Sequence, residues 1–340
     1  MKKAELWLPE NKKNVRCIAC HRRCIISPGR NGYCNTRENF DGVLYSSTWG
    51  HIAGGGSLDP IEKKPLYHFH PGTIVYSVGG WGCNFRCGMC QNYHIAHIVP
   101  NLKLQDMVSP DEIVNDAVSK DAKGIAFTYN EPALWPEYIR DTFRLAKGKD
   151  LYTVIVTNGT FTREALDYIG PYTDASAVDI KGMSESTLSH IGVQDIDPED
   201  ILESIIYARD RWGAHTECIT NIIPTINDSD EELNSIAMWI RDHLGPRIPW
   251  HVTRFYPALR FTHLMPTDLS VLQKAYRIGL DVGLSYVYIG NIKSPSGSST
   301  YCPNCHSIVI ERDGYSVTEK LTVNGRCTRC GENLQIIEDI

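Results

Sequence analysis

Between residues 74 and 290 the chain alternates short apolar segments with longer amphipathic ones, and this alternation constrains the fold more than any other feature. The short segments are rich in β-branched and aromatic residues, as is typical of parallel strands that are buried on both faces. We predict strands at 74–78, 125–129, 152–156, 175–180, 218–223, 251–255 and 286–289. Strands that alternate with crossover helices form a parallel sheet. The chain is therefore predicted to be an α/β protein.

Helix start signals lie between these strands. Ser109 is followed by Pro110 and Glu112, which combines a capping serine, a proline in the first turn and a glutamate three residues after the cap. Ser229 begins a second capping box, and Asp197 before a proline begins another helix. These signals support the alternation of strands and helices.

Three cysteines, Cys83, Cys87 and Cys90, follow the first predicted strand in a glycine-rich loop with the spacing C-x3-C-x2-C. No fourth cysteine lies nearby. A four-iron cluster held by three thiolates leaves one iron open, and an open position binds a reactive partner. The alternative is a zinc knuckle that takes a distant fourth ligand, but zinc sites favour C-x2-C pairs.

Eight more cysteines form two groups at the ends of the chain, and Cys218, in an apolar strand-like segment, is assigned no role. The C-terminal group is a pair of C-x2-C knuckles that predicts a structural zinc ribbon around a hairpin at residues 307–317. The N-terminal group has the spacing C-x2-C-x3-C-x9-C, for which zinc is favoured over an auxiliary iron–sulfur cluster, and His21 could replace one ligand. The two groups are Cys17, Cys20, Cys24 and Cys34, and Cys302, Cys305, Cys327 and Cys330.

Three regions are predicted: an N-terminal cysteine-rich metal-binding segment at 1–70, a central barrel at 71–293, and a zinc ribbon at 294–340 that follows a serine-rich linker. We expect no membrane segment and no secretory signal, hence a cytoplasmic protein, in which thiols stay reduced and bind metals. The net charge of −6 makes nucleic acid an unlikely partner by global attraction.

The cysteine loop and its position after a strand resemble the radical S-adenosylmethionine (SAM) superfamily. This resemblance implies a partial (β/α)6 barrel, and a [4Fe-4S] cluster on Cys83, Cys87 and Cys90 whose open iron chelates SAM. It also implies an electron donor, because a reduced cluster injects one electron into the sulfonium to release a 5′-deoxyadenosyl radical. In a barrel, residues at the carboxyl ends of the strands face the active site.

Several strand ends resemble those of the glycyl-radical-enzyme activases. Two of them depart in detail: Tyr129 and Asn130 stand where the activases have two glycines, and Met89 replaces a frequent aromatic residue. The resemblance implies cofactor-binding roles for Asn130 and Glu131 toward the SAM amino group, Asn158 in a Thr-Asn-Gly turn, Asp179, Lys181 and His251 toward the ribose and carboxylate, and Met89 and Gln91 beside the cluster.

Longer blocks around Cys17–Cys24, Gly29–Asn39, Asp59–Phe69 and Tyr288–Asn291 resemble one narrower group, the AmmeMemoRadiSam system radical SAM enzymes, which are related to pyruvate formate-lyase activating enzymes. The system name suggests Memo-like and AMMECR-like partners. We expect hydrogen abstraction from a protein or peptide substrate, in an activase or a modifying enzyme. The alternatives are radical chemistry on a small metabolite and a zinc-dependent nucleic-acid-binding module.

Overall fold

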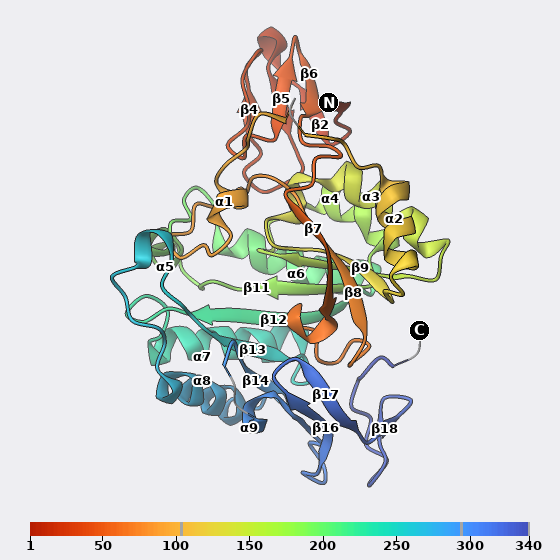
Figure 1. Ribbon diagram of the computed structural model, residues 1–340. Helices are drawn as coiled ribbons and strands as arrows, with labels where there is room; N and C mark the ends of the chain where they lie inside the picture. The colour runs from red at the N-terminus through yellow and green to blue at the C-terminus, as the bar shows by residue number, and fades with distance from the viewer. Residues whose placement is uncertain (103–104, 293–294, 339–340) are drawn as a thin grey trace.

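A computed structural model describes residues 1–102, 105–292 and 295–338. Its centre is an eight-stranded sheet with the order β14-β13-β12-β11-β10-β9-β8-β7 (Figure 1). The seven strands from β8 to β14 pair in parallel, and β7 (Gly54–Pro60) pairs antiparallel with β8. All seven predicted strands are present: β8 (Ile74–Gly79), β9 (Gly124–Phe127), β10 (Tyr152–Thr157), β11 (Ala175–Asp179), β12 (His215–Ile222), β13 (Trp250–Arg254) and β14 (Val287–Gly290).

Helices cover the outer face of this sheet. The predicted capping box is formed at α2, where the Ser109 side chain accepts from the Glu112 amide and Glu112 binds the Ser109 amide in return. Asp197 caps α6 and Ser229 caps α7 as predicted, but the second capping box is not closed, because the Glu232 carboxylate accepts from the Met183 amide and the Thr187 hydroxyl instead. The helices are α1 (Tyr93–Ala96), α2 (Pro110–Ser119), α3 (Pro136–Lys147), α4 (Arg163–Ile169), α5 (Glu185–Ile191), α6 (Pro198–Trp212), α7 (Asp230–Trp239), α8 (Leu269–Asp281) and α9 (Pro295–Ser298). In the three described ranges, no helix is long and apolar enough to cross a membrane.

The N-terminal segment forms two small three-stranded sheets at one end of the molecule, with the orders β2-β3-β4 and β1-β6-β5. Arg37 in β5 ties this segment to the central sheet through a buried ion pair with Glu137 of α3, at 2.6 Å. The strands are β1 (Lys2–Lys3), β2 (Trp7–Pro9), β3 (Val15–Cys17), β4 (Ile25–Ile26), β5 (Arg37–Phe40) and β6 (Val43–Ser46).

The C-terminal segment packs against the other end of the sheet. The predicted hairpin is β16 (Ile308–Asp313) and β17 (Ser316–Lys320), with β15 (Thr300–Tyr301) on the other side of β16. Arg312 of this hairpin is buried, and its Nη2 donates to the Tyr67 carbonyl at 2.8 Å. A further strand pair is β18 (Thr322–Val323) and β19 (Arg326–Cys327). The predicted boundary at 293 and 294 lies outside the described residues.

The inner face of the sheet carries apolar core residues along its strands and polar residues at the carboxyl ends of those strands. Apolar side chains from successive strands, including Val75, Ala126, Val154 and Ile219, fill one buried cluster inside the sheet. Polar residues follow at the carboxyl ends of the same strands, which is where parallel α/β folds place their ligand sites. The interior is therefore a packed base beneath a polar mouth.

Candidate active site

The glycine-rich loop after β8 brings the three cysteines to the mouth of the sheet. Gly82 has φ +81°, a conformation that side chains other than glycine rarely adopt, and its backbone passes Cys34 and Thr36 closely. The Asn130 side chain holds the loop, because it accepts from the Gly80 amide at 3.0 Å and donates to the Gly82 carbonyl at 2.9 Å. Asn130, predicted to contact SAM, therefore already braces the cluster loop.

The side chains of Cys83, Cys87 and Cys90 belong to one packed cluster, and the charges of Cys87 and Cys90 act on Cys83. Phe85 and Met89, which lie between them in the sequence, are buried beside them. Burial raises the pKa of Cys87 to about 11, although the nearby Lys181 ammonium acts in the opposite direction. The Lys181 charge also acts on Cys90. A cation therefore stands close to the thiolates that a cluster would require.

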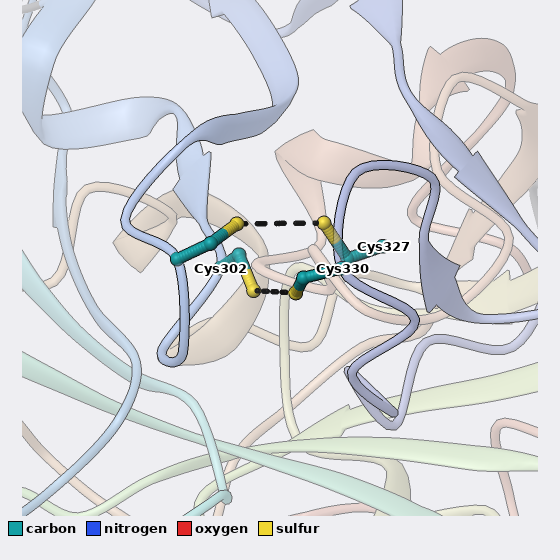
Figure 2. Close-up of side chains that lie close together, drawn as sticks. Cys302, Cys327 and Cys330 are labelled. Atoms are coloured by element: carbon teal, nitrogen blue, oxygen red, sulfur yellow. Dashed lines mark hydrogen bonds between the residues drawn. The ribbon is translucent and has the colours of Figure 1, made fainter.

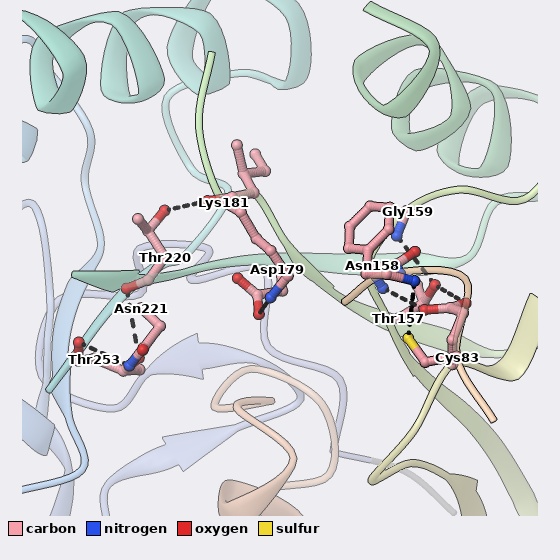
Figure 3. Close-up of polar contacts among 12 residues, drawn as sticks. Cys83, Thr157, Asn158, Gly159, Asp179, Lys181, Thr220, Asn221 and Thr253 are labelled. Carbon is pink, nitrogen blue, oxygen red and sulfur yellow. Dashed lines mark hydrogen bonds and ion pairs between the residues drawn. The ribbon is translucent and has the colours of Figure 1, made fainter. Parts of the chain in front are cut away.

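Asp179 and Lys181 stand opposite the cysteine loop at the end of β11 (Figure 3). Lys181 Nζ donates to Asp179 Oδ2 at 2.5 Å, while Asp179 Oδ1 is buried without a hydrogen-bond partner. Burial lowers the pKa of Lys181, but the charges of Asp179 and Cys87 outweigh it and raise the pKa above its usual range. The open carboxylate oxygen can accept a hydroxyl, as a SAM ribose would supply.

Glu131 and Asn158 form a buried network behind Cys83. Glu131 accepts from the Asn158 amide at 2.8 Å, the Ala133 amide at 2.9 Å and the Thr157 hydroxyl at 2.7 Å. Burial raises the pKa of Glu131 to about 7, even though these hydrogen bonds favour the carboxylate. The glutamate thus fixes the Thr-Asn-Gly turn beside the cluster loop, as Figure 3 shows for Cys83 and residues 157–159.

The His251 side chain contacts Glu217 and Tyr67 in the buried interior. Its Nε2 lies 2.7 Å from Glu217 Oε2 in the buried interior, and its ring packs against Tyr67 with centroids 4.7 Å apart. The structure holds the His251 side chain against Glu217 and Tyr67, and its contact with the SAM ribose stays a prediction. Gln91 is exposed. It lines a cleft of about 460 Å³ together with Tyr256, Asn291 and Tyr315.

Two groups of polar residues were missed by the sequence analysis. Asn221 and Thr253 lie near Asp179, joined by a hydrogen bond of 3.1 Å (Figure 3). Asn84, fully buried, donates to Thr160 at 2.6 Å and accepts from Asn158 at 2.9 Å. Its position directly after Cys83 was the signal that could have singled it out. Asn221 gave no such signal, because it lies within a strand.

The C-terminal cysteines meet as four thiols (Figure 2). Cys302 and Cys330 are 3.5 Å apart between sulfur atoms, Cys305 and Cys327 are 3.7 Å apart, and all four sulfurs lie within 4.8 Å of one another. Thiolates about 2.3 Å from one metal ion stand about 4 Å apart, so this set fits a single tetrahedral ion.

The N-terminal cysteines are arranged differently. All four line one small cavity, together with Arg37 and Asn84. His21 does not line it: its Nε2 lies 2.9 Å from the Ser204 hydroxyl and its Nδ1 lies 3.3 Å from Asp200. The structure therefore gives no support to His21 as a replacement ligand. Cys218 is fully buried in the core, as predicted.

Comparison with known proteins accounts for this arrangement. The model of the radical SAM superfamily matches residues 79–240, which contain the cysteine loop and the strand ends described above. The uncharacterized protein MJ0808 of Methanocaldococcus jannaschii is 37% identical over 99% of this chain and 100% of its own length. This chain belongs to the radical SAM family, and it is an enzyme of that class.

More distant relatives agree with this assignment. The pyruvate formate-lyase-activating enzyme of Clostridium pasteurianum is 25% identical over 55% of this chain and 77% of its own length. A crystal structure of a radical SAM methyltransferase from Sphaerobacter thermophilus superposes with a TM-score of 0.51 at 16% identity, covering 66% of this chain and 68% of that one. The second comparison supports the fold alone.

The family implies a [4Fe-4S] cluster and SAM, and the residues present fit both. Three cysteines lie close together in one loop, and the Lys181 ammonium acts on two of them, Cys87 and Cys90. Asp179 Oδ1 offers an unused acceptor for a hydroxyl. The donor set therefore suits a cluster with one open iron and a ligand that carries a ribose.

Proposed function

We propose that Cys83, Cys87 and Cys90 hold the cluster, and that SAM binds between them and the Asp179–Lys181 pair. When bound, the cluster supplies the electron that cleaves SAM to methionine and a 5′-deoxyadenosyl radical. The observation that carries the proposal is the buried Asp179 carboxylate, one of whose oxygens is bound by Lys181 while the other is unpartnered.

The chain's own residues position and shield the reaction. Lys181 offers a fixed positive charge for the SAM carboxylate, and Asp179 offers the ribose an acceptor. Asn130 braces the backbone that precedes Cys83, while Glu131 holds the turn that carries Asn158. Buried Phe85 and Met89 exclude water from the cluster side, which protects a radical from unwanted hydrogen donors. The His251 ring is held by Glu217, so we assign it a supporting role.

We propose that the substrate is a protein or a peptide. The cleft that Gln91 lines is about 460 Å³ and is bounded by Tyr256 after β13, Asn291 after β14 and Tyr315 of the C-terminal hairpin. Tyr315 and Tyr256 both donate hydrogen bonds to Asn291, at 3.3 and 3.0 Å. The C-terminal hairpin thus forms one side of the entrance, which suits an extended chain. The relationship to activating enzymes supports the same choice.

Zinc is proposed at Cys302, Cys305, Cys327 and Cys330, because four thiolates at this spacing close a tetrahedron and leave no reactive position. Its role would be structural, in the third of the three regions, 1–70, 71–293 and 294–340. We also propose membership of the AmmeMemoRadiSam system, with Memo-like and AMMECR-like proteins as candidate partners. This rests on the sequence blocks alone.

One experiment tests the activity and a second tests the substrate class. Anaerobically reconstituted enzyme with dithionite and SAM should form 5′-deoxyadenosine, and Cys87→Ala should abolish this product. Cell extract is then divided by ultrafiltration into protein and small-molecule fractions. Faster formation of 5′-deoxyadenosine with the protein fraction, lost after protease treatment, is the expected result. Stimulation by the small-molecule fraction alone would instead support chemistry on a metabolite.

A further inference from the structure

The two four-cysteine groups differ in the distances between their sulfur atoms, and this difference indicates which metal centre each group suits. In the described ranges, the four C-terminal cysteine sulfurs lie within 4.8 Å of one another, whereas no three of the N-terminal cysteine sulfurs do. Yet Cys17, Cys20, Cys24 and Cys34 surround one cavity. A single zinc ion draws its thiolates about 4 Å apart. In a four-iron cluster each thiolate binds a different iron, so the thiolates stand farther apart around a larger core.

The cavity between the N-terminal cysteines is enclosed mostly by thiols and apolar side chains. Three of the four cysteines are buried, and the wall is completed by apolar groups such as Ala19, Ile26 and Leu134. A closed apolar cavity lined by four thiols suits an iron–sulfur core.

The Arg37 side chain independently indicates that an anionic group binds in this cavity. Its guanidinium is 1% exposed, and its two terminal nitrogens donate to Glu137 at 3.2 and 2.6 Å. Its Nε is buried without a hydrogen-bond partner, although the side chain lines the cysteine cavity. A buried N–H donor without an acceptor costs about 1–3 kcal/mol. A thiolate or a cluster sulfide would supply the acceptor, and such hydrogen bonds tune cluster potentials.

The cavity shares a wall with the radical SAM loop. Asn84, the residue after Cys83, lines the cavity. On the other side of Cys83, a β-carbon placed at Gly82 would lie 2.7 Å from the carbonyl oxygen of Cys34. Residues adjacent to Cys83 on both sides therefore contact the N-terminal cysteine segment. Cys24 is only half-buried, and Tyr33, which packs on Arg22 and Arg86, is 38% exposed, so the cavity also lies near the surface.

We propose that Cys17, Cys20, Cys24 and Cys34 hold an auxiliary [4Fe-4S] cluster in place of zinc, and that this cluster relays electrons to the radical SAM cluster. When bound, the auxiliary cluster would take one electron from a one-electron donor protein and go from the 2+ to the 1+ state. It would return to 2+ by passing that electron to the oxidised cluster held by Cys83, Cys87 and Cys90, which would go from 2+ to 1+. No bond forms or breaks in this transfer. The relay rests on the proposed function, whereas the cluster itself does not.

The first test counts metals without changing the N-terminal site. The Cys83→Ala/Cys87→Ala/Cys90→Ala variant, reconstituted anaerobically, should retain about four irons per chain and a reduced-cluster EPR signal that SAM does not alter. Wild type should hold about eight irons and about one zinc. About two zincs and no iron in the triple variant would overturn the auxiliary cluster. A wild-type signal that SAM does not perturb would instead count against the proposed function, so the two failures are distinguishable.

The second test addresses the relay. Cys20→Ala/Cys24→Ala should lose about four irons and keep a SAM-sensitive signal. With reduced flavodoxin as donor, its 5′-deoxyadenosine formation should fall by about tenfold or more, equivalent to ~1.4 kcal/mol in the barrier. With a small reductant, titanium(III) citrate, its rate should stay close to that of wild type. Cys218→Ala, a buried cysteine outside both sites, is the matched control. Equal losses with both reductants would overturn the relay.

Discussion

The carbonyl oxygen of Cys34 and the α-carbon of Gly82 approach so closely that a β-carbon at Gly82 would lie 2.7 Å from that oxygen and 2.5 Å from Thr36 Cγ2. The N-terminal cysteine segment and the radical SAM loop are thus in direct backbone contact. This contact joins the two cysteine sites more tightly than their 49-residue separation between Cys34 and Cys83 suggests.

Gly82→Ala should therefore damage both sites. Its φ of +81° alone costs alanine about 1 kcal/mol, and the clash adds about 1–3 kcal/mol. We expect a lower thermal unfolding midpoint and less iron bound after reconstitution. Gly29→Ala is the matched control, because Gly29 has φ +72° but no atom within 4 Å of its β-carbon position. Equal effects of the two variants would mean that the contact between the loops does not matter.

Asp179→Asn should weaken SAM binding. The substitution keeps the size of the side chain but removes the charge that pairs with Lys181, and it replaces one carboxylate oxygen by a donor. A charge-assisted hydrogen bond contributes about 1.5–3 kcal/mol, so the dissociation constant for SAM should rise by about tenfold or more. Equilibrium dialysis with the oxidised, reconstituted enzyme measures this directly. Asp210→Asn, in a surface pair with Arg209, is the control, and an unchanged constant in Asp179→Asn would exclude the proposed contact.

The seven parallel strands could be predicted because each is a short apolar segment of the sequence. The end of a strand was misplaced where the strand contains buried polar residues. The strand predicted from Cys218 begins at His215, because Thr216 and Glu217 also pair with β11. Glu217 is fully buried and bound by His215 and His251. No local pattern distinguishes such a glutamate from a turn residue. The same hidden partner holds the ring of His251, which lies on a strand that was predicted correctly.

A glycine-rich segment was also not predicted as a strand. Gly54, Gly55 and Gly56 begin β7, an antiparallel strand on the edge of the sheet. Glycine is a poor strand former, so local propensity could not reveal pairing that tertiary contact decides. The cysteine groups were found from spacing, but the distances between their sulfurs, which separate a single ion from a cluster, exist only in three dimensions.

Arg312→Met should release the C-terminal segment from the sheet. Arg312 and Glu62 are both fully buried, 3.4 Å apart, and Arg312 also binds the Thr300 hydroxyl at 2.8 Å. Removal of one partner leaves an unpaired buried charge, which costs about 3–5 kcal/mol. We expect faster proteolysis near residue 300 and a lower unfolding midpoint. Glu62→Gln/Arg312→Met should recover part of the loss, and exposed Arg329→Met should have little effect.

Stability should fall as the pH is lowered through the unfolded-state pKa of His68. This imidazole is fully buried, its Nε2 lies 2.7 Å from the Tyr288 hydroxyl, and its Nδ1 has no hydrogen-bond partner. Burial lowers the pKa of His68 to about 3, although the charge of Glu217 acts to raise it. Below a pH of about 6.5 the unfolded chain binds a proton at this residue and the folded chain does not, so unfolding becomes easier.

Between about pH 7.5 and pH 5.5 this residue alone should remove about 1.4 kcal/mol of the free energy of unfolding. Anaerobic urea unfolding at the two pH values measures the loss. His68→Gln should be less stable at both, because it disturbs the bond to Tyr288, but its loss between them should be smaller than that of wild type by about this amount. His263→Gln, at an exposed position, controls for the exchange of side chains. The same pH dependence in wild type and His68→Gln would contradict a neutral buried imidazole.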